Sequence, residues 1–589
     1  MRARSSRRLS VLLALYLLLT GGIAWRLVSV QVVSAQEYRD LAQRQTLRDY
    51  ELPARRGRLY DRMGDPLAMS LPASTVYADP RVLQEDAVVR AGITPESVAA
   101  ELAPVMGMEE EGLADRLRAD THFVYLGRQL PRGVGQAVAA MTLPGVGVLE
   151  EPARTYPAGG LAAQVIGFVG IDNTGLAGLE HQHDSVLAGQ AGRARSERAP
   201  GGLMIGAAPI EIEPAAPGAD LVLTIDRHIQ FAAEDALTRA VKQFDAKGAS
   251  AIVIDVATGE VLAMASAPSF EPDEISGSDD YARRNRAVTD VYEPGSVNKV
   301  ITIAAALEEG LVTPDEVFRV PDRFQVGSKT FRDTHSHPET DMSVSEIMSQ
   351  SSNIGTIQIA DQLGEEALYE YVQRFGYGSK TGLGFPGESA GLLPDVSNWS
   401  ATSLPTIAIG HGVSATLLQV AEVFQTIAAD GQWVQPTLLR GSVGADGRIR
   451  PAESPRRQRV VSPGTAEAVA DMLVGVVESG TGGQAAVAGY NVGGKTGTAR
   501  KPSQTGPGYV EGAYISSFAG FAPAENPAVV VAVMVDEPKR GYYAGSTAGP
   551  LFSEIMGFTL SHRRVAPSEP EGQASADPAA GEMTRGPAG

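Results

Sequence analysis

The stretch GYNVGGKTGT, residues 489–498, separates two possible folds for this chain. From Gly489 it satisfies G-x-x-x-x-G-K-[ST], the loop that holds nucleotide phosphates between a strand and a helix. The sixteen residues after Thr496, GTARKPSQTGPGYVEG, contain two prolines and four glycines, so no helix is expected there. Strand-like residues follow at 513–536. The pattern therefore favours a β-strand that carries Lys495 over a phosphate loop.

The composition narrows the class of protein. The chain has 589 residues, enough for two or three domains, and 43% of them are hydrophobic. Its formal net charge is −19, which argues against nucleic acid as a main partner, because phosphate binding needs a basic face. Cysteine is absent, which excludes disulfides, a thiolate nucleophile and cysteine-ligated metals. We expect no cofactor.

The N-terminus predicts a membrane anchor. MRARSSRRLS contains four arginines and no acid, and no charged residue lies between Leu9 and Trp25. We predict a cytoplasmic tail at 1–8 and a transmembrane helix at 9–30, with the rest of the chain outside the cytoplasm. A cleaved signal peptide ending near Val33–Ala35 is the alternative, but the apolar run is long for a signal core.

The remaining chain divides into segments that differ in composition and in expected secondary structure. We predict a mixed, elongated pedestal domain at 31–215, which begins with an exposed helix over Ala35–Tyr50 and has a turn at Met63–Asp65 between two strands. From 216 to 565 we predict an α+β domain. It starts with strands, including a hairpin that turns at Thr258-Gly259, continues with helices at 298–309, 343–363 and 412–429, and ends with strands at 518–538 and a helix near 549–561. Residues 566–589 are rich in Pro, Gly, Ala and Glu and are predicted to be disordered.

A serine and a lysine in EPGSVNKV, residues 293–300, are candidates for catalysis. Ser296 and Lys299 are three apart at the start of an apolar helical run, so their side chains share a helix face. A neutral lysine can take the proton of a serine hydroxyl and make it a nucleophile. The chain has eight lysines, and only Lys299 has a serine three residues before it.

Two further short patterns follow in order. Ser351-Ser352-Asn353 offers a relay hydroxyl and an amide that can hold a peptide group, though alone the pattern is weak because serines are common in helix caps. Lys495-Thr496-Gly497-Thr498 offers an ammonium group and hydroxyls for a carboxylate, with a glycine where substrate approaches the backbone. Lys380-Thr381-Gly382 competes with it but lies in a turn-rich segment, so we predict a structural loop there.

Together Ser296-x-x-Lys299, Ser351-x-Asn353 and Lys495-Thr496-Gly497 resemble the three motifs of the penicillin-binding serine D,D-transpeptidases. Flanking segments match too, among them RRGRLYDRMGDPLA (55–68) and DEPKRGYYAGSTAGPLFSEIM (536–556). The resemblance covers about residues 9–560 and is strongest to class B penicillin-binding proteins of the division-specific FtsI type. It implies a serine β-lactamase-like catalytic domain with a central antiparallel sheet and helices.

The resemblance also implies roles. Ser296 would attack a stem pentapeptide and become acylated, with Lys299 as base and Ser351 as proton relay. Asn353 would hold the substrate backbone, and Lys495, Thr496 and Thr498 would bind its terminal carboxylate beside Gly497. The backbone N–H groups of Ser296 and Thr498 would form the oxyanion hole. Implied partners are peptidoglycan stem peptides, the membrane, β-lactams as inhibitors, a glycosyltransferase of the FtsW (SEDS) type and other divisome proteins.

Some alternatives stay open at this point. An elongation-specific class B enzyme, a β-lactam-hydrolysing or sensing protein, and a catalytically inactive divisome scaffold are rivals of the septal transpeptidase. His335, His337 and Glu339 in THSHPE could indicate zinc, but no further ligands cluster there, so we expect no metal and a loop that lines the substrate groove. His411 in IGHGVSAT is expected to support the active-site wall.

Overall fold

The computed structural model describes residues 2–33, 36, 47–198, 204–327, 329–444, 446–503 and 508–568. The chain folds into two compact units. Unit one contains residues 1–56, 70–153 and 188–218, and unit two contains 57–69, 154–187 and 219–589. The tail beyond residue 568, which the sequence predicts to be disordered, lies outside the described residues.

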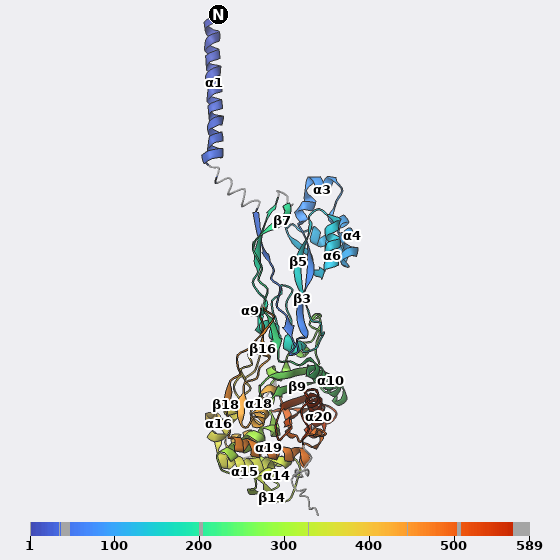
Figure 1. Cartoon of the computed structure of the whole chain (residues 1–589), viewed down its shortest axis with the longest axis vertical. Coiled ribbons are helices and arrows are strands. Elements are labelled where there is room, and N and C mark those ends of the chain that lie inside the picture. Colours follow the sequence, from blue (N-terminus) through green and yellow to red (C-terminus); the bar gives the residue numbers. More distant parts are fainter. Residues whose placement is uncertain are drawn as a thin grey trace, which may run out of the picture. The chain divides into compact units, whose positions relative to one another are not determined.

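The N-terminal helix α1 extends over Arg2–Val28 and continues as a π-helical turn over Ser29–Val33 (Figure 1). Leu9–Val32 has a mean hydropathy of 1.9 over its most apolar window, and none of that window is buried. Within the described residues it is the one helix long and apolar enough to cross a membrane. Large apolar side chains such as Leu18 and Trp25 are exposed along it, as expected of a helix whose partner is lipid.

The rest of unit one combines strands with helices. Its helices and strands are β1 (Leu47–Leu52), β3 from Ser70 onward (Pro66–Ala78 in full), α3 (Asp86–Arg90), α4 (Pro95–Met106), α5 (Glu110–Leu117), β4 (Val124–Pro131), α6 (Arg132–Met141), β5 (Val146–Thr155), β6 (Gly192–Arg198) and β7 (Met204–Glu213). The order β1-β6-β7 forms one sheet, and β3 pairs with β4 and β5 in another. The helix predicted over Ala35–Tyr50 is therefore wrong at 47–50, because β1 pairs with β6, a strand far away in the sequence. Most of the remaining residues of that predicted helix are not described.

Unit two is built on a five-stranded antiparallel sheet of order β10-β9-β21-β20-β19. Its strands are β9 (Gly248–Asp255), β10 (Val261–Ala267), β19 (Gly493–Pro502), β20 (Tyr509–Ala522) and β21 (Val529–Asp536). The predicted hairpin is confirmed, and Gly259 in its turn has a φ of +71°. The central antiparallel sheet with helices, predicted from the order of elements, is also confirmed.

Helices cover both faces of this sheet. Helices α10 (Arg227–Phe244) and α20 (Ala544–His562) pack on one face, and α18 (Leu417–Ala428) packs on the other (Figure 1). Side chains alternate along β9 and β21, so that Val253 and Val531 join the core under α10 and α20, while Ile254 and Val530 join the core under α18. Such continuous hydrophobic strands are typical of a sheet buried on both sides.

A helical layer follows on the α18 side. It contains α11 (Asp280–Arg283), α12 (Arg286–Thr289), α13 (Lys299–Glu308), α14 (Val344–Gln350), α15 (Asn353–Leu363), α16 (Glu365–Arg374), α17 (Ser403–Ala408) and α19 (Pro463–Glu478). Short elements complete the unit, namely β2 (Leu59–Tyr60), α7 (Ala163–Ile166), α8 (Gly178–Gln182), α9 (Asp184–Leu187), β8 (Asp220–Leu223), β11 (Val317–Val320), β12 (Phe324–Val326), β13 (Lys329–Phe331), β14 (Thr340–Ser343), β15 (Gln432–Val434), β16 (Leu439–Val443), β17 (Ile449–Pro451) and β18 (Arg457–Arg459).

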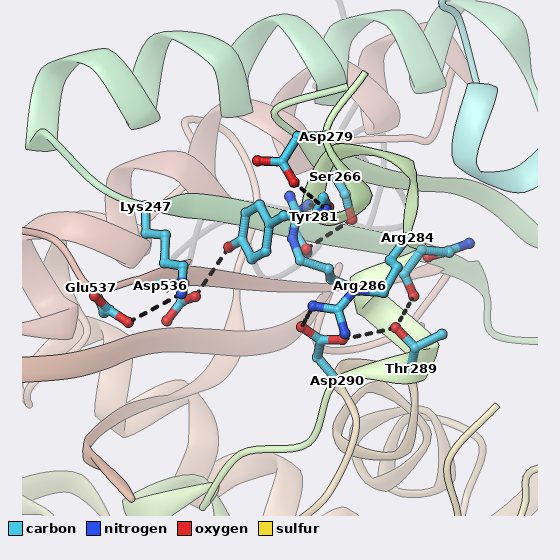
Figure 2. Close-up of polar contacts among 12 residues, drawn as sticks. Lys247, Ser266, Asp279, Tyr281, Arg284, Arg286, Thr289, Asp290, Asp536 and Glu537 are labelled. Carbon is cyan, nitrogen blue, oxygen red and sulfur yellow. Dashed lines mark hydrogen bonds and ion pairs between the residues drawn. The ribbon is translucent and has the colours of Figure 1, made fainter. Parts of the chain in front are cut away.

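A buried arginine fixes the segment that leads from the sheet to Ser296. Arg286 is 2% exposed, and its guanidinium donates to the carbonyls of Ala267 (2.6 Å) and Tyr281 (2.5 Å). Its central carbon also lies 4.0 Å from the centroid of the Tyr281 ring, whose hydroxyl donates to Asp536 Oδ2 at 3.1 Å (Figure 2). The contacts join α12 to the ends of β10 and β21. They anchor the chain ten positions before Ser296.

Candidate active site

Ser296 lies in a tight turn, Gly295–Asn298, that leads directly into α13. Gly295 has a φ of +57° and donates its backbone N–H to Gly410 O at 3.0 Å. Asn298 Nδ2 donates to Ile407 O at 2.7 Å. A Cβ on Gly410 would lie 2.0 Å from Gly295 O, so that glycine is required by close approach. The segment 407–410 thus holds the serine turn in place through these two hydrogen bonds.

The Ser296 hydroxyl is half-buried, and within the described part of the chain it has no hydrogen-bond partner. The turn packs on β19, because a Cβ on Gly295 would lie 3.3 Å from Thr498 O. Ser296 is therefore placed beside the strand that carries Lys495. A free hydroxyl at this position can receive an incoming electrophile.

Lys299 is fully buried, and its Nζ donates to Ser351 O at 2.6 Å and to Ser351 Oγ at 3.2 Å. In this structure the Lys299 amine therefore contacts the second motif, and Ser296 has no hydrogen bond to it within the described residues. Burial lowers the pKa of Lys299 to about 7, against the opposing effect of the Asp333 charge. A lysine with this pKa is partly neutral at neutral pH and can accept a proton.

The Ser351–Asn353 segment is a break between two helices. Ser351 ends α14 in the left-handed conformation, with a φ of +60°, and Ser352 caps α15 by accepting from Gly355 N. The single helix predicted over 343–363 is therefore wrong at this point. The left-handed residue directs both Ser351 oxygens to Lys299, while Asn353 Nδ2 donates to Arg332 O at 2.9 Å.

Asp333 also belongs to the site, with its side chain largely enclosed, and it is not among the residues predicted from the sequence. Its carboxylate accepts from Ser352 Oγ at 2.7 Å, from Ile354 N at 3.0 Å and from Asn353 N. It also lies 3.1 Å from His337 Nε2. The signal in the sequence is faint, because the aspartate precedes the THSHPE stretch without any fixed spacing to the three motifs.

Lys495 lies on β19, the edge strand of the sheet, opposite Ala519 of β20. It is fully buried, and its Nζ has one long contact, 3.5 Å to Thr496 Oγ1. Burial and the nearby charge of Lys299 lower the pKa of Lys495 well below its usual value. A Cβ on Gly497 would lie 2.5 Å from Val297 Cγ2, so only glycine lets the strand approach the serine turn.

The two threonines of β19 belong to the opposite strand face from Lys495, because side chains alternate along a strand. Thr496 Oγ1 lies 2.9 Å from Thr481 Oγ1, and Thr498 Oγ1 accepts from Ala544 N at 3.1 Å, at the start of α20. The Thr498 oxygen is thus already engaged as an acceptor, although its hydroxyl hydrogen is still available for donation. Thr498 is half-buried and Thr496 is buried.

Glu293 and His411 connect the serine turn to its surroundings. Glu293 accepts from Gly412 N at 2.9 Å and from the Tyr509 hydroxyl at 3.0 Å, and it lies 2.8 Å from His411 Nδ1. Burial alone would raise the pKa of Glu293, but the hydrogen bonds from His411 and Gly412 outweigh it and keep the carboxylate charged. The pair ties the segment before Ser296 to the loop that supports it.

The structure also places the phosphate-loop pattern, the Lys380–Gly382 segment and the histidines of THSHPE. Lys495 and Thr496 lie inside a strand that continues to Pro502, so the phosphate-loop interpretation is wrong. Thr381 lies in a loop, as predicted, and bonds to Glu388 through its N–H and hydroxyl. Across the described residues there is no group of three or more His, Cys, Asp or Glu side chains arranged to hold a metal ion. His337 bonds within its loop, to Pro338 O and Asp333.

Comparisons with known proteins agree with this geometry. Residues 249–557 match the family described as Penicillin binding protein transpeptidase domain, and residues 51–223 match the Penicillin-binding Protein dimerisation domain. Penicillin-binding protein PbpB of Mycolicibacterium smegmatis is 36% identical over 542 residues, which cover 87% of this chain and 84% of that protein. Peptidoglycan D,D-transpeptidase FtsI of Escherichia coli is 33% identical over 562 residues, which cover 95% and 91%.

Solved structures show the same architecture. The crystal structure of penicillin binding protein 3 from Mycobacterium tuberculosis, complexed with aztreonam, superposes with a TM-score of 0.69 at 32% sequence identity. The match covers 88% of this chain and 99% of that one. A peptidoglycan synthetase from Bifidobacterium adolescentis gives a TM-score of 0.72 at 27% identity, with 89% and 98% covered. The chain therefore belongs to the class B penicillin-binding proteins, the D,D-transpeptidase family in which a dimerisation domain precedes the transpeptidase domain.

Proposed function

We propose that this protein is a membrane-anchored serine D,D-transpeptidase that cross-links peptidoglycan stem peptides through an acyl-enzyme on Ser296. One observation carries the proposal most directly. Lys299 is a buried lysine with a pKa of about 7, and it donates a hydrogen bond to Ser351. It follows Ser296 by three positions, and Ser296 is half-buried with a free hydroxyl. This arrangement supplies a nucleophile, a base and a relay hydroxyl without a cofactor.

In the acylation step, neutral Lys299 takes the Ser296 proton as Oγ attacks the carbonyl of the penultimate D-alanine. The tetrahedral oxyanion is stabilised by the backbone N–H groups of Ser296 and Thr498. Ser351, which accepts a hydrogen bond from Lys299 Nζ, passes the proton to the departing amine. The C–N bond breaks, and free D-alanine leaves as the Ser296 ester remains.

The donor peptide adds to the free side of β19. An edge strand presents unpaired N–H and C=O groups that an extended peptide can satisfy. Lys495 supplies the positive charge for the terminal carboxylate, assisted by the Thr496 and Thr498 hydroxyls, and Gly497 keeps the strand surface open. Asn353 holds the peptide backbone from the opposite wall. A second stem-peptide amine then attacks the ester, and a β-lactam that mimics the donor leaves the ester trapped.

The anchor and the cellular role belong to the same proposal. The arginines before Leu9 favour an N-terminus in the cytoplasm, with a pedestal at 31–215 and a catalytic domain at 216–565 outside the cytoplasm. The relative named FtsI and the 536–556 segment favour septal wall synthesis, with a glycosyltransferase of the FtsW (SEDS) type and other divisome proteins as partners.

The test uses purified full-length chain in detergent and a fluorescent penicillin. We expect stoichiometric labelling that maps to a Ser296 peptide and is lost in Ser296→Ala. Ser561→Ala is a matched serine control, since Ser561 is exposed on α20 and belongs to none of the three motifs, and it should keep its label on Ser296. Labelling that survives Ser296→Ala would overturn the proposal. Release of the label within minutes would instead identify a β-lactam-hydrolysing enzyme.

A further inference from the structure

The Ser351–Asn353 turn is held from two sides by opposite charges. Lys299 Nζ donates to both oxygens of Ser351 on one side. On the other, Asp333 accepts from the Ser352 hydroxyl and from two backbone N–H groups at the start of α15. Backbone hydrogen bonds from Ser351 and Ser352 to Ile347 O close the end of α14, and the two side chains add contacts on either side of that turn. The lysine and the aspartate act on consecutive residues of one turn.

Asp333 itself is nearly enclosed. Its side chain is 8% exposed, and that of His337, which lies beside it, is 19% exposed. A buried carboxylate is costly unless hydrogen bonds and a positive charge compensate it. Asp333 has three donors from the turn, the His337 ring, and the nearby charge of Lys299. The aspartate is thus the negative charge that faces the catalytic lysine across the turn.

We propose that Asp333, with His337 hydrogen-bonded to it, is a positioning residue of the transpeptidase reaction: its carboxylate holds Ser352 and the backbone of Asn353, and it places a negative charge across the turn from Lys299. Asp333 does not touch substrate and accepts no proton in the cycle. The inference deepens the proposed function and rests on it, because it assigns how the second motif is held for acylation of Ser296.

The charges around Lys299 decide the direction of the effect. Lys299 faces Asp333, which favours its protonated form, and Lys495, which disfavours it. Removal of the Asp333 charge leaves burial and Lys495 unopposed, so the base form of Lys299 should persist to lower pH. His337 has a raised pKa, chiefly through its bonds to Pro338 O and Asp333 and secondarily through the Asp322 charge. When His337 is protonated it offsets part of the Asp333 charge.

The experiment measures the second-order rate of Ser296 acylation by a fluorescent penicillin between pH 5.5 and 9, with the full chain in detergent. In Asp333→Asn we expect a plateau roughly tenfold or more below wild type, because charged hydrogen bonds to the turn are lost. We also expect the acidic limb of the profile, the pH range in which the rate falls as Lys299 becomes protonated, to move to lower pH. In Asp333→Glu, which keeps the charge and shifts its position, the plateau should fall while the limb stays in place.

Two more variants complete the test. Asp341→Asn removes an equal charge from β14, at an exposed position eight residues along the chain, and should reproduce the wild-type profile. His337→Gln retains a donor without a titratable charge. It should move the acidic limb to higher pH, opposite to Asp333→Asn, because the Asp333 charge is then no longer offset. This variant tests the inference even if Asp333→Asn does not fold.

The outcomes separate the two proposals. If no variant and no wild-type sample is labelled at Ser296, the proposed function fails. If Ser296 is labelled but Asp333→Asn matches Asp341→Asn, or loses rate without any shift of the limb while His337→Gln is also unshifted, the inference about Asp333 is overturned. Opposite shifts in the Asp333→Asn and His337→Gln profiles support it.

Discussion

Two lysines on one strand illustrate how this domain uses buried charge. Lys495 and Lys501 both lie on β19, six positions apart. Lys501 is paired with Asp536 at 2.6 Å and Glu537 at 2.7 Å, which outweigh burial and raise its pKa. Lys495 has no carboxylate partner in the described structure, so burial, together with the nearby charge of Lys299, lowers its pKa well below the usual value.

The difference separates charges that the protein satisfies itself from a charge that requires a ligand. At the Lys501 end two carboxylates neutralise the charge. The Arg286 cluster in Figure 2, made of Arg286, Tyr281 and Asp536, is likewise satisfied by protein groups, a carbonyl and an aromatic ring among them. Lys495 lacks a carboxylate partner in the described structure, so a bound ligand would have to supply its counter-charge. An uncompensated buried cation is expensive for folding and is expected only where another molecule supplies the anion. Substitutions should therefore separate the two ends, one through activity and the other through stability.

The largest effect is expected for Lys299→Met, which keeps the length of the side chain and removes the amine. Acylation of Ser296 should fall by about 10²–10⁴-fold, the usual contribution of a general base, without loss of the fold. Stopped-flow labelling with a fluorescent penicillin and a thermal melt measure the two properties. Wild-type acylation in this variant would exclude Lys299 as the base.

Arg286→Leu should destabilise the protein by about 2–3 kcal/mol, because two buried carbonyls lose their donor. The variant tests whether the Arg286 cluster is structural. The Tm should drop, while the pH dependence of acylation should match wild type in the surviving folded protein. A variant with normal Tm and slow acylation would assign the cluster to the reaction.

Lys501→Met should lower stability by about 1–2 kcal/mol, since Asp536 and Glu537 would lose their shared partner. Lys495→Met is its matched control on the same strand. That substitution should leave the Tm unchanged or higher while reducing affinity for a carboxylate-bearing penicillin. If Lys495→Met melts lower than Lys501→Met, the contrast between the two ends is wrong.

A further effect should appear in the pH dependence of stability. The folded-state pKa of Lys299 is about 7, below its usual 10.5, so between these values the unfolded chain holds more protons. Stability should therefore rise with pH across this window. Melting curves at pH 7.5 and 9.5 should show a smaller upward trend for Lys299→Met than for wild type. Equal trends would mean that Lys299 titrates normally in the fold.

The sequence predicted the parts of the molecule that depend on local pattern. The hairpin with Gly259 in its turn, the membrane-length helix and the three motifs follow from hydrophobic runs and spacing. The break at Ser351 was missed because residues 343–363 have continuous helical character, whereas Ser351 adopts a left-handed conformation that ends α14 and contacts Lys299 from a distant part of the sequence. Strand β1 was mistaken for a helix, because its partner β6 lies some 145 positions away.

The site was predicted by residue type more accurately than by contact. The sequence placed Lys299 beside Ser296, but the fold directs its amine to Ser351. It grouped Lys495 with both threonines for one carboxylate, and it did not show that Thr496 also contacts Thr481 and that Thr498 accepts from the start of α20. Such pairings are decided by elements that meet only in three dimensions, and no spacing within a motif records them.

The most direct measurement is the pH profile of Ser296 acylation in the wild-type chain. A buried lysine base predicts a rate that rises with pH and has its midpoint near 7, where Lys299 loses its proton. The midpoint should not depend on which penicillin is used. A rate that is independent of pH between 5.5 and 9, or that rises only above pH 9, would contradict the account.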